Sequence, residues 1–258
     1  MTEGTISGFL IDLDGVLYTG DTPILGARET IGFLTDHGYP FRCLSNSTRK
    51  CRRTIAARLE TMGFSIPESS IFTPPLAAVR YMKDAKKDRA FLLVTGDVDR
   101  DFAGACTDNG SVQTDYVVVG DAGDKVTYAN LNHAFRCLME GAELLALERD
   151  RYWMDRDGLS LSAGPVVAAL EMAAGTTATV FGKPSKEFFG LALADLGVPK
   201  DKVVMIGDDI ATDIGGAQGT GIRGTLVRTG KFSPAALKDS PVRPDHVLDS
   251  ISDILTLV

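Results

Sequence analysis

The stretch that decides the fold is ISGFLIDLDG, residues 6–15. Ile6–Leu13 is apolar and rich in β-forming residues, which predicts a buried strand, and two aspartates lie at its carboxyl end. Residues i and i+2 of a strand point to the same face, so Asp12 and Asp14 share one small space. At ~7 Å and an effective dielectric constant of ~20 their repulsion is roughly 2–2.5 kcal/mol, which predicts a nearby cation. A plain turn with helix-capping carboxylates is the alternative.

Strand-like and helix-like segments alternate outward from this stretch. Apolar runs predict strands at Phe41–Leu44, Ala178–Phe181 and Val203–Ile206, and helical spacing predicts helices at Thr48–Met62 and Ser185–Leu196. This βαβα order predicts the α/β class, with a Rossmann-like, doubly wound parallel sheet that carries helices on both faces.

Two of these strands are followed by residues that can hold an anion. Ser45 and Asn46 follow the second strand and precede a helix, where hydroxyls and free N–H groups bind phosphate. An ordinary helix N-cap is the alternative there. Lys183 follows Ala178–Phe181, at the strand edge where open α/β sheets bind ligands, although most lysines are solvated surface groups.

A third group of acidic residues follows Val203–Ile206. Asp208, Asp209 and Asp213 fall within six residues of one another, and such carboxylates suit a hard cation such as magnesium. The alternative is a charged loop in which Asp209 or Thr212 caps the next helix. Taken together, the strand ends predict three carboxylate positions, a hydroxyl and a lysine at one edge of one sheet.

These motifs in this order resemble the haloacid-dehalogenase (HAD) superfamily of phosphotransferases across nearly the whole chain. Residues 12–16 are similar to its first motif, Ser45-Asn46 to its second, Lys183 to its third and residues 207–213 to its fourth. Further stretches, including residues 119–123, 215–218 and 227–231, look closest to the phospholysine phosphohistidine inorganic pyrophosphate phosphatase family and its HAD-domain relatives.

The resemblance implies a role for each motif residue. Asp12 is the nucleophile that forms an aspartyl-phosphate, and Asp14 is the general acid and base. The Asp12 carboxylate, the Asp14 carbonyl and Asp208 hold Mg²⁺, in preference to Asp209. The same resemblance gives Ser45, Asn46 and Lys183 to the phosphoryl oxygens. Asp213 then orients Lys183 or a metal-bound water.

The spacing of the motifs predicts an inserted domain. Asp12 and Ser45 are 33 residues apart, whereas Ser45 and Lys183 are 138 residues apart, and one helix with one strand needs only ~30–40. The surplus predicts a HAD core of residues 1–73 and 180–258 and an α/β cap of residues 74–179. This resembles the C2 cap of type IIA members, such as NagD-like and 4-nitrophenylphosphatase-like enzymes.

The segment 151–165 of the insert is the candidate for substrate selection. It mixes guanidinium, aromatic and carboxylate groups ahead of a helix, and Arg151 and Trp153 are its candidate contacts. The alternative places the aromatic residues in the core of the insert and the arginines in solvent. The substrate predicted is a small phosphorylated metabolite: a phosphomonoester, a pyrophosphate or a phosphoamide.

Other functions fit less well. A phosphotransferase or mutase of the same superfamily stays open, although mutases with this Asp pair usually carry a helical cap after the first motif. Receiver-like signalling modules also combine aspartates, a hydroxyl and a lysine, but they are about half this length. A catalytically idle scaffold would not need all these polar groups.

The composition of the chain limits which partners and which cellular location are expected. The net charge of −7 argues against broad nucleic-acid binding, and the four cysteines lack the CxxC spacing of zinc or thioredoxin-type sites. No secretion signal and no apolar run of membrane-spanning length is seen, so we expect a cytoplasmic protein without a membrane partner. The resemblance also allows a homodimer formed through the cap.

Overall fold

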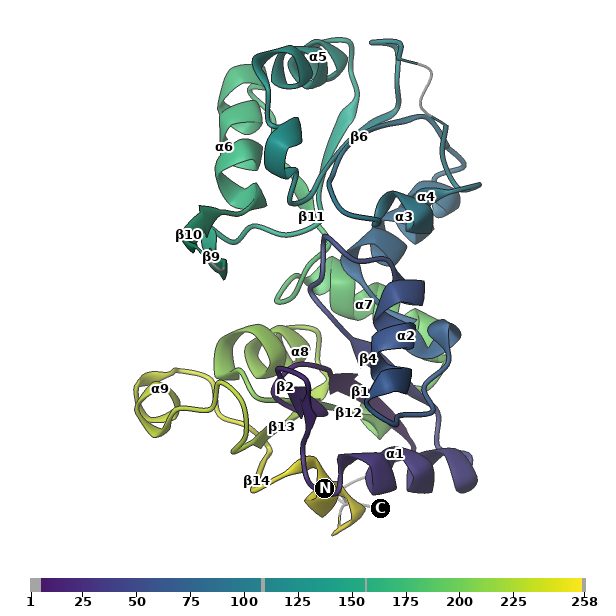
Figure 1. Ribbon diagram of the computed structural model, residues 1–258, viewed down its shortest axis with the longest axis vertical. Coiled ribbons are helices and arrows are strands. Elements are labelled where there is room, and N and C mark those ends of the chain that lie inside the picture. Colours follow the sequence, from purple (N-terminus) through teal and green to yellow (C-terminus); the bar gives the residue numbers. More distant parts are fainter. Residues whose placement is uncertain (1–5, 108–109, 156, 257–258) are drawn as a thin grey trace. The chain divides into compact units, whose positions relative to one another are not determined.

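The computed structural model describes residues 6–107, 110–155 and 157–256 of the 258-residue chain. Contacts divide the chain into two compact units. Unit 1 comprises Met1–Ser45, Arg53–Phe72 and Lys183–Val258, and unit 2 comprises Asn46–Arg52 and Thr73–Gly182. Each unit has a parallel sheet of its own (Figure 1). No helix in the described ranges combines the length and apolar character needed to cross a bilayer.

The sheet of unit 1 has the order β14-β13-β12-β1-β4-β5, and all of its strand pairs are parallel. These strands are β1 (Gly8–Asp12), β4 (Phe41–Leu44), β5 (Ile71–Phe72), β12 (Val203–Gly207), β13 (Arg223–Val227) and β14 (His246–Leu248). Every residue of β1 and β12 is buried, as expected for central parallel strands covered on both faces. A short hairpin, β2 (Tyr18–Thr19) with β3 (Thr22–Pro23), follows β1.

Helices cover both faces of this sheet. On one face, apolar residues of α1 (Ala27–Asp36) and α2 (Arg52–Thr61) pack with Phe9 and Ile11. On the other, α7 (Lys186–Leu196) contacts β1 and β4, and Phe188 lies edge-on to Phe72. The predicted doubly wound α/β class is therefore confirmed. The remaining helical segments of unit 1 are Glu68–Ser70, Lys200–Lys202, Ile210–Gly215, α8 (Gly216–Gly219), α9 (Pro234–Asp239) and Ile251–Thr256.

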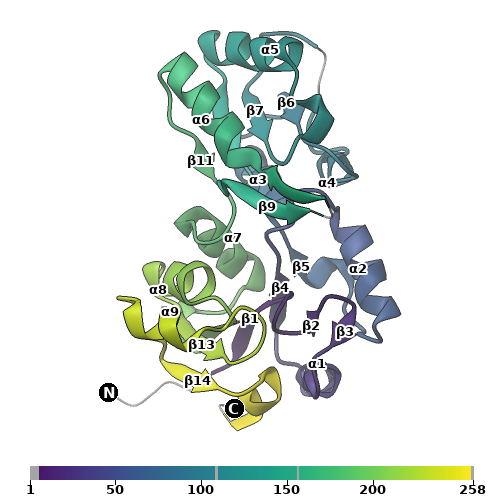
Figure 2. The ribbon, with the colours of Figure 1, turned by 60° about the vertical axis from the view of Figure 1, so that its left-hand side comes forward.

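Unit 2 has a second parallel sheet with the order β11-β8-β7-β6. Its strands are β6 (Ala90–Leu93), β7 (Tyr116–Val119), β8 (Glu143–Ala146) and β11 (Thr179–Val180). The helices α5 (Tyr128–Met139) and α6 (Ala163–Ala174) lie side by side and pack on a buried cluster with β7 and β8 (Figure 2). The other helical segments are α3 (Pro74–Asp84), α4 (Asp99–Phe102) and Gly123–Lys125.

A separate two-stranded hairpin, β9 (Tyr152–Asp155) with β10 (Gly158–Leu161), connects β8 to α6. It occupies most of the segment that the sequence suggests for substrate selection. Arg156, which belongs to that segment, lies outside the described residues.

The helix predicted at Thr48–Met62 begins only at Arg52. The reason is that residues 46–52 belong to unit 2, where the carboxylates of other residues bind their backbone. The Asp97 carboxylate accepts hydrogen bonds from the Cys51 backbone (2.8 Å) and thiol (3.3 Å), and the Asp101 carboxylate accepts one from the Arg52 backbone (3.1 Å). These groups replace the local N-cap that Thr48 would have supplied.

The predicted strand at Ala178–Phe181 is shorter and belongs to a different sheet. β11 pairs Thr179 with Leu145 and Val180 with Ala146 of β8, so it extends the sheet of unit 2. The expectation that Lys183 follows a strand of the first sheet was therefore wrong. Lys183 instead opens the last segment of unit 1, just before Ser185 caps α7 by accepting a hydrogen bond from the Phe188 N–H (3.1 Å).

Candidate active site

Strand register brings several predicted residues to one edge of the unit 1 sheet. Asp12 ends β1 and pairs with Leu44, so Ser45 is the next residue on the neighbouring strand. On the other side Ile11 pairs with Ile206 of β12, and Asp208 is the first residue after that strand. Carboxyl ends of parallel strands meet at the same edge, which is where open α/β sheets place their ligands.

Lys183 is the buried cation of this edge. Its ammonium donates to Asp12 Oδ1 at 2.5 Å and to Asp213 Oδ1 at 2.7 Å. All three side chains are at least nine-tenths buried as residues. The cation required by the crowded carboxylates is thus supplied by a residue 171 positions away in the chain.

Asp12, Asp208 and Asp213 form one carboxylate cluster, in which an oxygen of each lies within 4.8 Å of the others. Asp213 has both oxygens engaged, since Oδ1 accepts from Lys183 and Oδ2 from the Asp209 backbone at 3.1 Å. Asp209 lies outside the cluster: its carboxylate caps the next helical turn through the Ala211 and Thr212 N–H groups, at 2.9 and 3.0 Å.

The pKa values of Asp12 and Asp208 are raised by burial and by the closeness of three carboxylates beside a single ammonium. Burial raises the pKa of Asp12 to about 7, against the opposing effect of Lys183, and burial raises the pKa of Asp208 to about 6. Burial alone would lower the pKa of Lys183, but the Asp12 and Asp213 carboxylates outweigh it and hold that pKa above its usual value. A second positive charge would relieve the remaining repulsion.

The donor set fits a hard divalent cation. In the part of the chain that the structure describes, Asp208 Oδ2 accepts from the Lys231 N–H (2.6 Å) and Oδ1 accepts no hydrogen bond. Asp12 Oδ2 likewise accepts none there. Two buried carboxylates, each with an oxygen left over, are the ligands that magnesium-like ions prefer.

Two glycines shape the place of Asp208, and sequence reasoning gave them no role. A Cβ placed on Gly15 would lie 1.9 Å from Asp208 Oδ2, and one on Gly230 would lie 2.0 Å from it. Both glycines have φ values in the left-handed region, at 86° and 58°. Thr229 Oγ1 also donates to the Gly15 carbonyl at 2.5 Å. The sequence signals were the resemblance of residues 12–16 and 227–231 to the family.

The other predicted site residues lie outside the cluster of Lys183 with the three carboxylates. Asp14 is exposed, beyond the end of β1, where its backbone bridges to Tyr18. Ser45 is half-buried in unit 1, and its N–H donates to the Phe72 carbonyl at 3.1 Å. Asn46 groups with unit 2. The structure thus brings together Asp12, Lys183, Asp208 and Asp213 and sets Asp14 outside their cluster.

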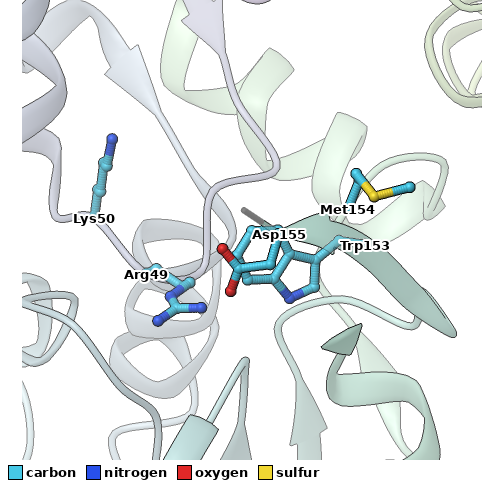
Figure 3. A pocket seen from close by; sticks show the side chains of 5 residues that line it. All are labelled: Arg49, Lys50, Trp153, Met154 and Asp155. Atoms are coloured by element: carbon cyan, nitrogen blue, oxygen red, sulfur yellow. The ribbon is translucent and has the colours of Figure 1, made fainter. Parts of the chain in front are cut away.

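Unit 2 holds an open pocket of about 570 Å³ lined by Arg49, Lys50, Trp153, Met154 and Asp155 (Figure 3). The Arg49 guanidinium lies 5.1 Å from the centre of the Trp153 ring, a cation–aromatic contact. Nη1 of this guanidinium also lies 3.4 Å from Oδ2 of Asp121. Sequence reasoning missed Arg49, which lies three residues after Asn46 of the second motif.

Arg151, the other candidate for substrate selection, does not line this pocket. Its guanidinium lies 5.7 Å from the ring centre of the exposed Tyr152. The two candidate residues therefore have different surroundings, although they are two positions apart.

The parallel sheet, its acidic edge and the inserted α/β unit define the class of protein as a Rossmann-like α/β fold with an inserted cap domain. Family models agree: residues 9–106 match the haloacid dehalogenase-like hydrolase model, and residues 180–254 match a HAD-hydrolase-like model. The chain belongs to the HAD-like hydrolases and is a phosphatase of their type IIA group, acting on phosphoester bonds.

Individual relatives cover almost the whole chain. The chain is 39% identical over 254 residues to the phospholysine phosphohistidine inorganic pyrophosphate phosphatase of Danio rerio, covering 96% of this chain and 92% of that protein. NagD from E. coli K-12 superposes with a TM-score of 0.87 and 26% identity, covering 97% and 98% of the two chains. A 4-nitrophenylphosphatase from Thermotoga maritima gives the same TM-score and identity, covering 97% of each chain.

Proposed function

We propose that this phosphatase hydrolyses a small phosphorylated metabolite in a Mg²⁺-dependent reaction that passes through an aspartyl-phosphate on Asp12. The observation that carries the proposal is the buried Lys183–Asp12 pair beside Asp208 and Asp213. Phosphoryl transfer asks a protein for positioning and charge stabilisation, and this cluster supplies a nucleophile with a fixed cation beside it.

In the first half of the cycle, a carboxylate oxygen of Asp12 attacks phosphorus and the bond from phosphorus to the leaving oxygen breaks. Asp14 donates a proton to that oxygen as general acid. The exposed position of Asp14 suits this role, because its carboxyl is outside the Lys183 cluster. The products of this half are the free alcohol, or the corresponding leaving group, and the aspartyl-phosphate.

In the second half, Asp14 takes a proton from water as general base, and the water oxygen attacks phosphorus. The bond between phosphorus and Asp12 breaks, which releases phosphate and restores the Asp12 carboxylate. Ser45, the Asn46 N–H and Lys183 hold the phosphoryl oxygens in both halves. Asp213 holds Lys183 in place, since it accepts a hydrogen bond from that ammonium at 2.7 Å.

The Asp12 carboxylate, the Asp14 carbonyl and Asp208 would hold Mg²⁺. When bound, the ion would neutralise the carboxylate cluster and polarise the phosphoryl group. The unengaged oxygens of Asp12 and Asp208 support this ligand set, and Asp209 is disfavoured because its carboxylate caps a helical turn.

The pocket of unit 2 is the proposed determinant of the leaving group. Trp153 offers a flat apolar surface, and Arg49 and Lys50 offer positive charge beside it. We extend the proposed selectivity contacts from Arg151 and Trp153 to Arg49. A phosphomonoester, a pyrophosphate and a phosphoamide all remain candidates, and the name of the Danio rerio relative makes the last two worth testing.

A phosphate-release assay tests the function. Purified chain is incubated with p-nitrophenyl phosphate, pyrophosphate and phospholysine, in MgCl₂ or in excess chelator. We expect release in MgCl₂ that stops on chelation and returns when Mg²⁺ is added back. The Asp12→Asn variant is the control for a contaminating phosphatase. Transfer to an added acceptor without release of phosphate would instead indicate a phosphotransferase.

The expected partners are proposals of the same kind. We propose a cytoplasmic enzyme with a small-molecule substrate and no nucleic-acid or membrane partner. We also propose that two copies associate through unit 2. Light scattering coupled to gel filtration tests the association: a monomer at all concentrations would contradict it.

A further inference from the structure

Glu148 is a buried carboxylate of unit 2 that the proposed reaction does not use. It follows β8 by two residues and is 5% exposed. Its Oε1 accepts hydrogen bonds from the Ser162 hydroxyl at 2.6 Å and the Ala163 N–H at 2.7 Å, while Oε2 accepts one from the Asp150 N–H. Burial raises the pKa of this carboxyl, so the site needs its hydrogen bonds to compensate for lost solvation.

The hydrogen-bond partners of Glu148 lie where the chain enters and leaves the β9–β10 hairpin, two places that we call its roots. Asp150 lies two residues before β9, and Ser162 directly follows β10. One carboxylate thus binds the chain where it enters the hairpin and where it leaves. Two backbone bonds join the same roots: Ser162 N–H to the Arg151 carbonyl (3.3 Å) and Gly164 N–H to the Asp150 carbonyl (3.0 Å).

The helix α6 shows that this arrangement is more than a local cap. Ser162 is at the N-cap position of α6, where a serine ordinarily accepts a hydrogen bond from the first turn. Here the Ser162 side chain makes no such bond and donates to Glu148 instead. Glu148 itself receives the first N–H of the helix, where a negative charge is favourable.

The hairpin has little burial to hold it in place. On one face the cross-strand pairs Leu161–Tyr152 and Leu159–Met154 leave four apolar side chains, each more than half exposed. An isolated two-stranded hairpin is marginal in water, so its orientation depends strongly on how its roots are fixed. Trp153, on the other face, forms the wall of the pocket with Arg49.

We propose that Glu148 is a positioning residue, which fixes the β9–β10 hairpin and thereby the place of Trp153 in the substrate-selecting pocket. The role of that pocket rests on the proposed function. The clamp, by which we mean the hydrogen bonds that Glu148 accepts from Asp150, Ser162 and Ala163, rests on those contacts alone. The consequence is that loss of the clamp should loosen Trp153 and change which leaving groups are favoured, with much less effect on a small ester.

Three variants separate the parts of the clamp. Glu148→Gln keeps the size of the side chain but presents an N–H₂ group to one of the donors. Ser162→Ala removes only the hydrogen bond from the Ser162 hydroxyl and leaves the Ala163 and Asp150 N–H groups with their acceptor. Glu148→Ala removes all of these hydrogen bonds. Glu143→Gln is the matched control, because Glu143 begins the same strand β8 but, among the described residues, is not bound to the hairpin: its carboxylate accepts hydrogen bonds from the Tyr81 hydroxyl (2.8 Å) and the Thr179 hydroxyl (3.1 Å).

The primary measurement is the fluorescence anisotropy decay of Trp153, the only tryptophan in the chain, together with its quenching by acrylamide. Nanosecond loop motion depolarises tryptophan emission. We expect a larger fast component and stronger quenching in Glu148→Gln and Ser162→Ala, and wild-type values in Glu143→Gln. If only the melting temperature falls while Trp153 keeps its wild-type anisotropy, Glu148 is a helix cap and the proposal is overturned.

The second measurement is kcat/KM for p-nitrophenyl phosphate, AMP, pyridoxal 5′-phosphate and glucose 6-phosphate. In Glu148→Gln we expect the kcat/KM values of the three larger esters to change relative to one another by roughly tenfold, mainly through KM. The change in kcat/KM for p-nitrophenyl phosphate, the small ester, should be smaller. Equal losses on all four would contradict a positioning role. Because the fluorescence needs no substrate, it decides the clamp even if the proposed function fails.

Discussion

At the scale of single residues, Asp12 and Asp14 stand two positions apart in very different surroundings. Asp12 is buried against Lys183, whereas Asp14 is exposed. This difference suits a division of labour between a nucleophile and a proton carrier. The sequence predicted the need for a cation near them but could not tell that Lys183 supplies it, because the contact spans 171 residues.

The first prediction concerns this pair. Asp12→Asn should abolish turnover with the fold intact, because the amide cannot form the acyl-phosphate. Asp14→Asn should lower turnover by ~10²–10⁴, the usual contribution of general acid–base catalysis. Steady-state kinetics with circular dichroism as the folding control checks both. Near-native turnover by Asp12→Asn would exclude a covalent route through this residue.

The second prediction separates the two adjacent aspartates after β12. Asp208→Ala should sharply raise the Mg²⁺ concentration needed for half-maximal activity, because it removes the proposed ligand with an unengaged oxygen. Asp209→Ala should raise it much less, since that carboxylate caps a helical turn. Its expected cost is instead in stability, about 1 kcal/mol. Magnesium titrations and urea unfolding of both variants give the ranking, and the reverse order would shift the ligand to Asp209.

At the scale of elements, the sequence predicted the central strands well because continuous apolar runs mark parallel strands. It failed where long-range contacts override local signals. The start of α2 is set by Asp97 and Asp101, more than forty residues later in the chain. β8 was missed because ELLA, its four-residue sequence, has no alternation and no β-branched residue.

The third prediction tests this long-range cap. Asp97→Ala should lower the free energy of unfolding by about 1 kcal/mol, because the Cys51 N–H loses its acceptor. Asp99→Ala is the control: it removes the same charge from the adjacent α4, where Asp99 is exposed and makes no described side-chain bond. Denaturant unfolding of both variants provides the comparison. Equal stabilities would mean that Asp97 does not set the start of the helix.

The fourth prediction concerns the selectivity contacts on the hairpin. Trp153→Ala and Arg49→Ala should change the relative kcat/KM of large and small esters by roughly 1–3 kcal/mol, because each removes one side of the pocket. Arg151→Ala should have a smaller effect, since Arg151 stacks on Tyr152 outside the pocket. The panel of substrates used for Glu148 supplies the measurement. If Arg151→Ala shifts the ranking most, the pocket is not the selective surface.

At the scale of the whole molecule, the domain to which residues 46–52 belong differs most from the prediction, which placed them in the core of residues 1–73. They directly follow Ser45, yet they belong to unit 2, held by the ends of two adjacent parallel strands. A Gly-Asp dipeptide follows each of these strands: Asp97, after β6, accepts a hydrogen bond from Cys51, and Asp121, after β7, pairs with Arg49. The two dipeptides, Gly96-Asp97 and Gly120-Asp121, are visible in the sequence, but their binding to residues 49–51 could not be predicted without the fold.

The most direct test of the central claim is to trap the covalent intermediate. The Asp14→Asn variant is mixed with p-nitrophenyl phosphate and MgCl₂, quenched in acid within one turnover, digested and analysed by mass spectrometry. The leaving group of this ester needs no proton, so the variant should form the intermediate and hydrolyse it slowly. We predict a phosphoryl group on Asp12, together with a burst of p-nitrophenol. An unmodified Asp12 at the end of the burst, or a phosphoryl group on another residue, would contradict the proposed mechanism.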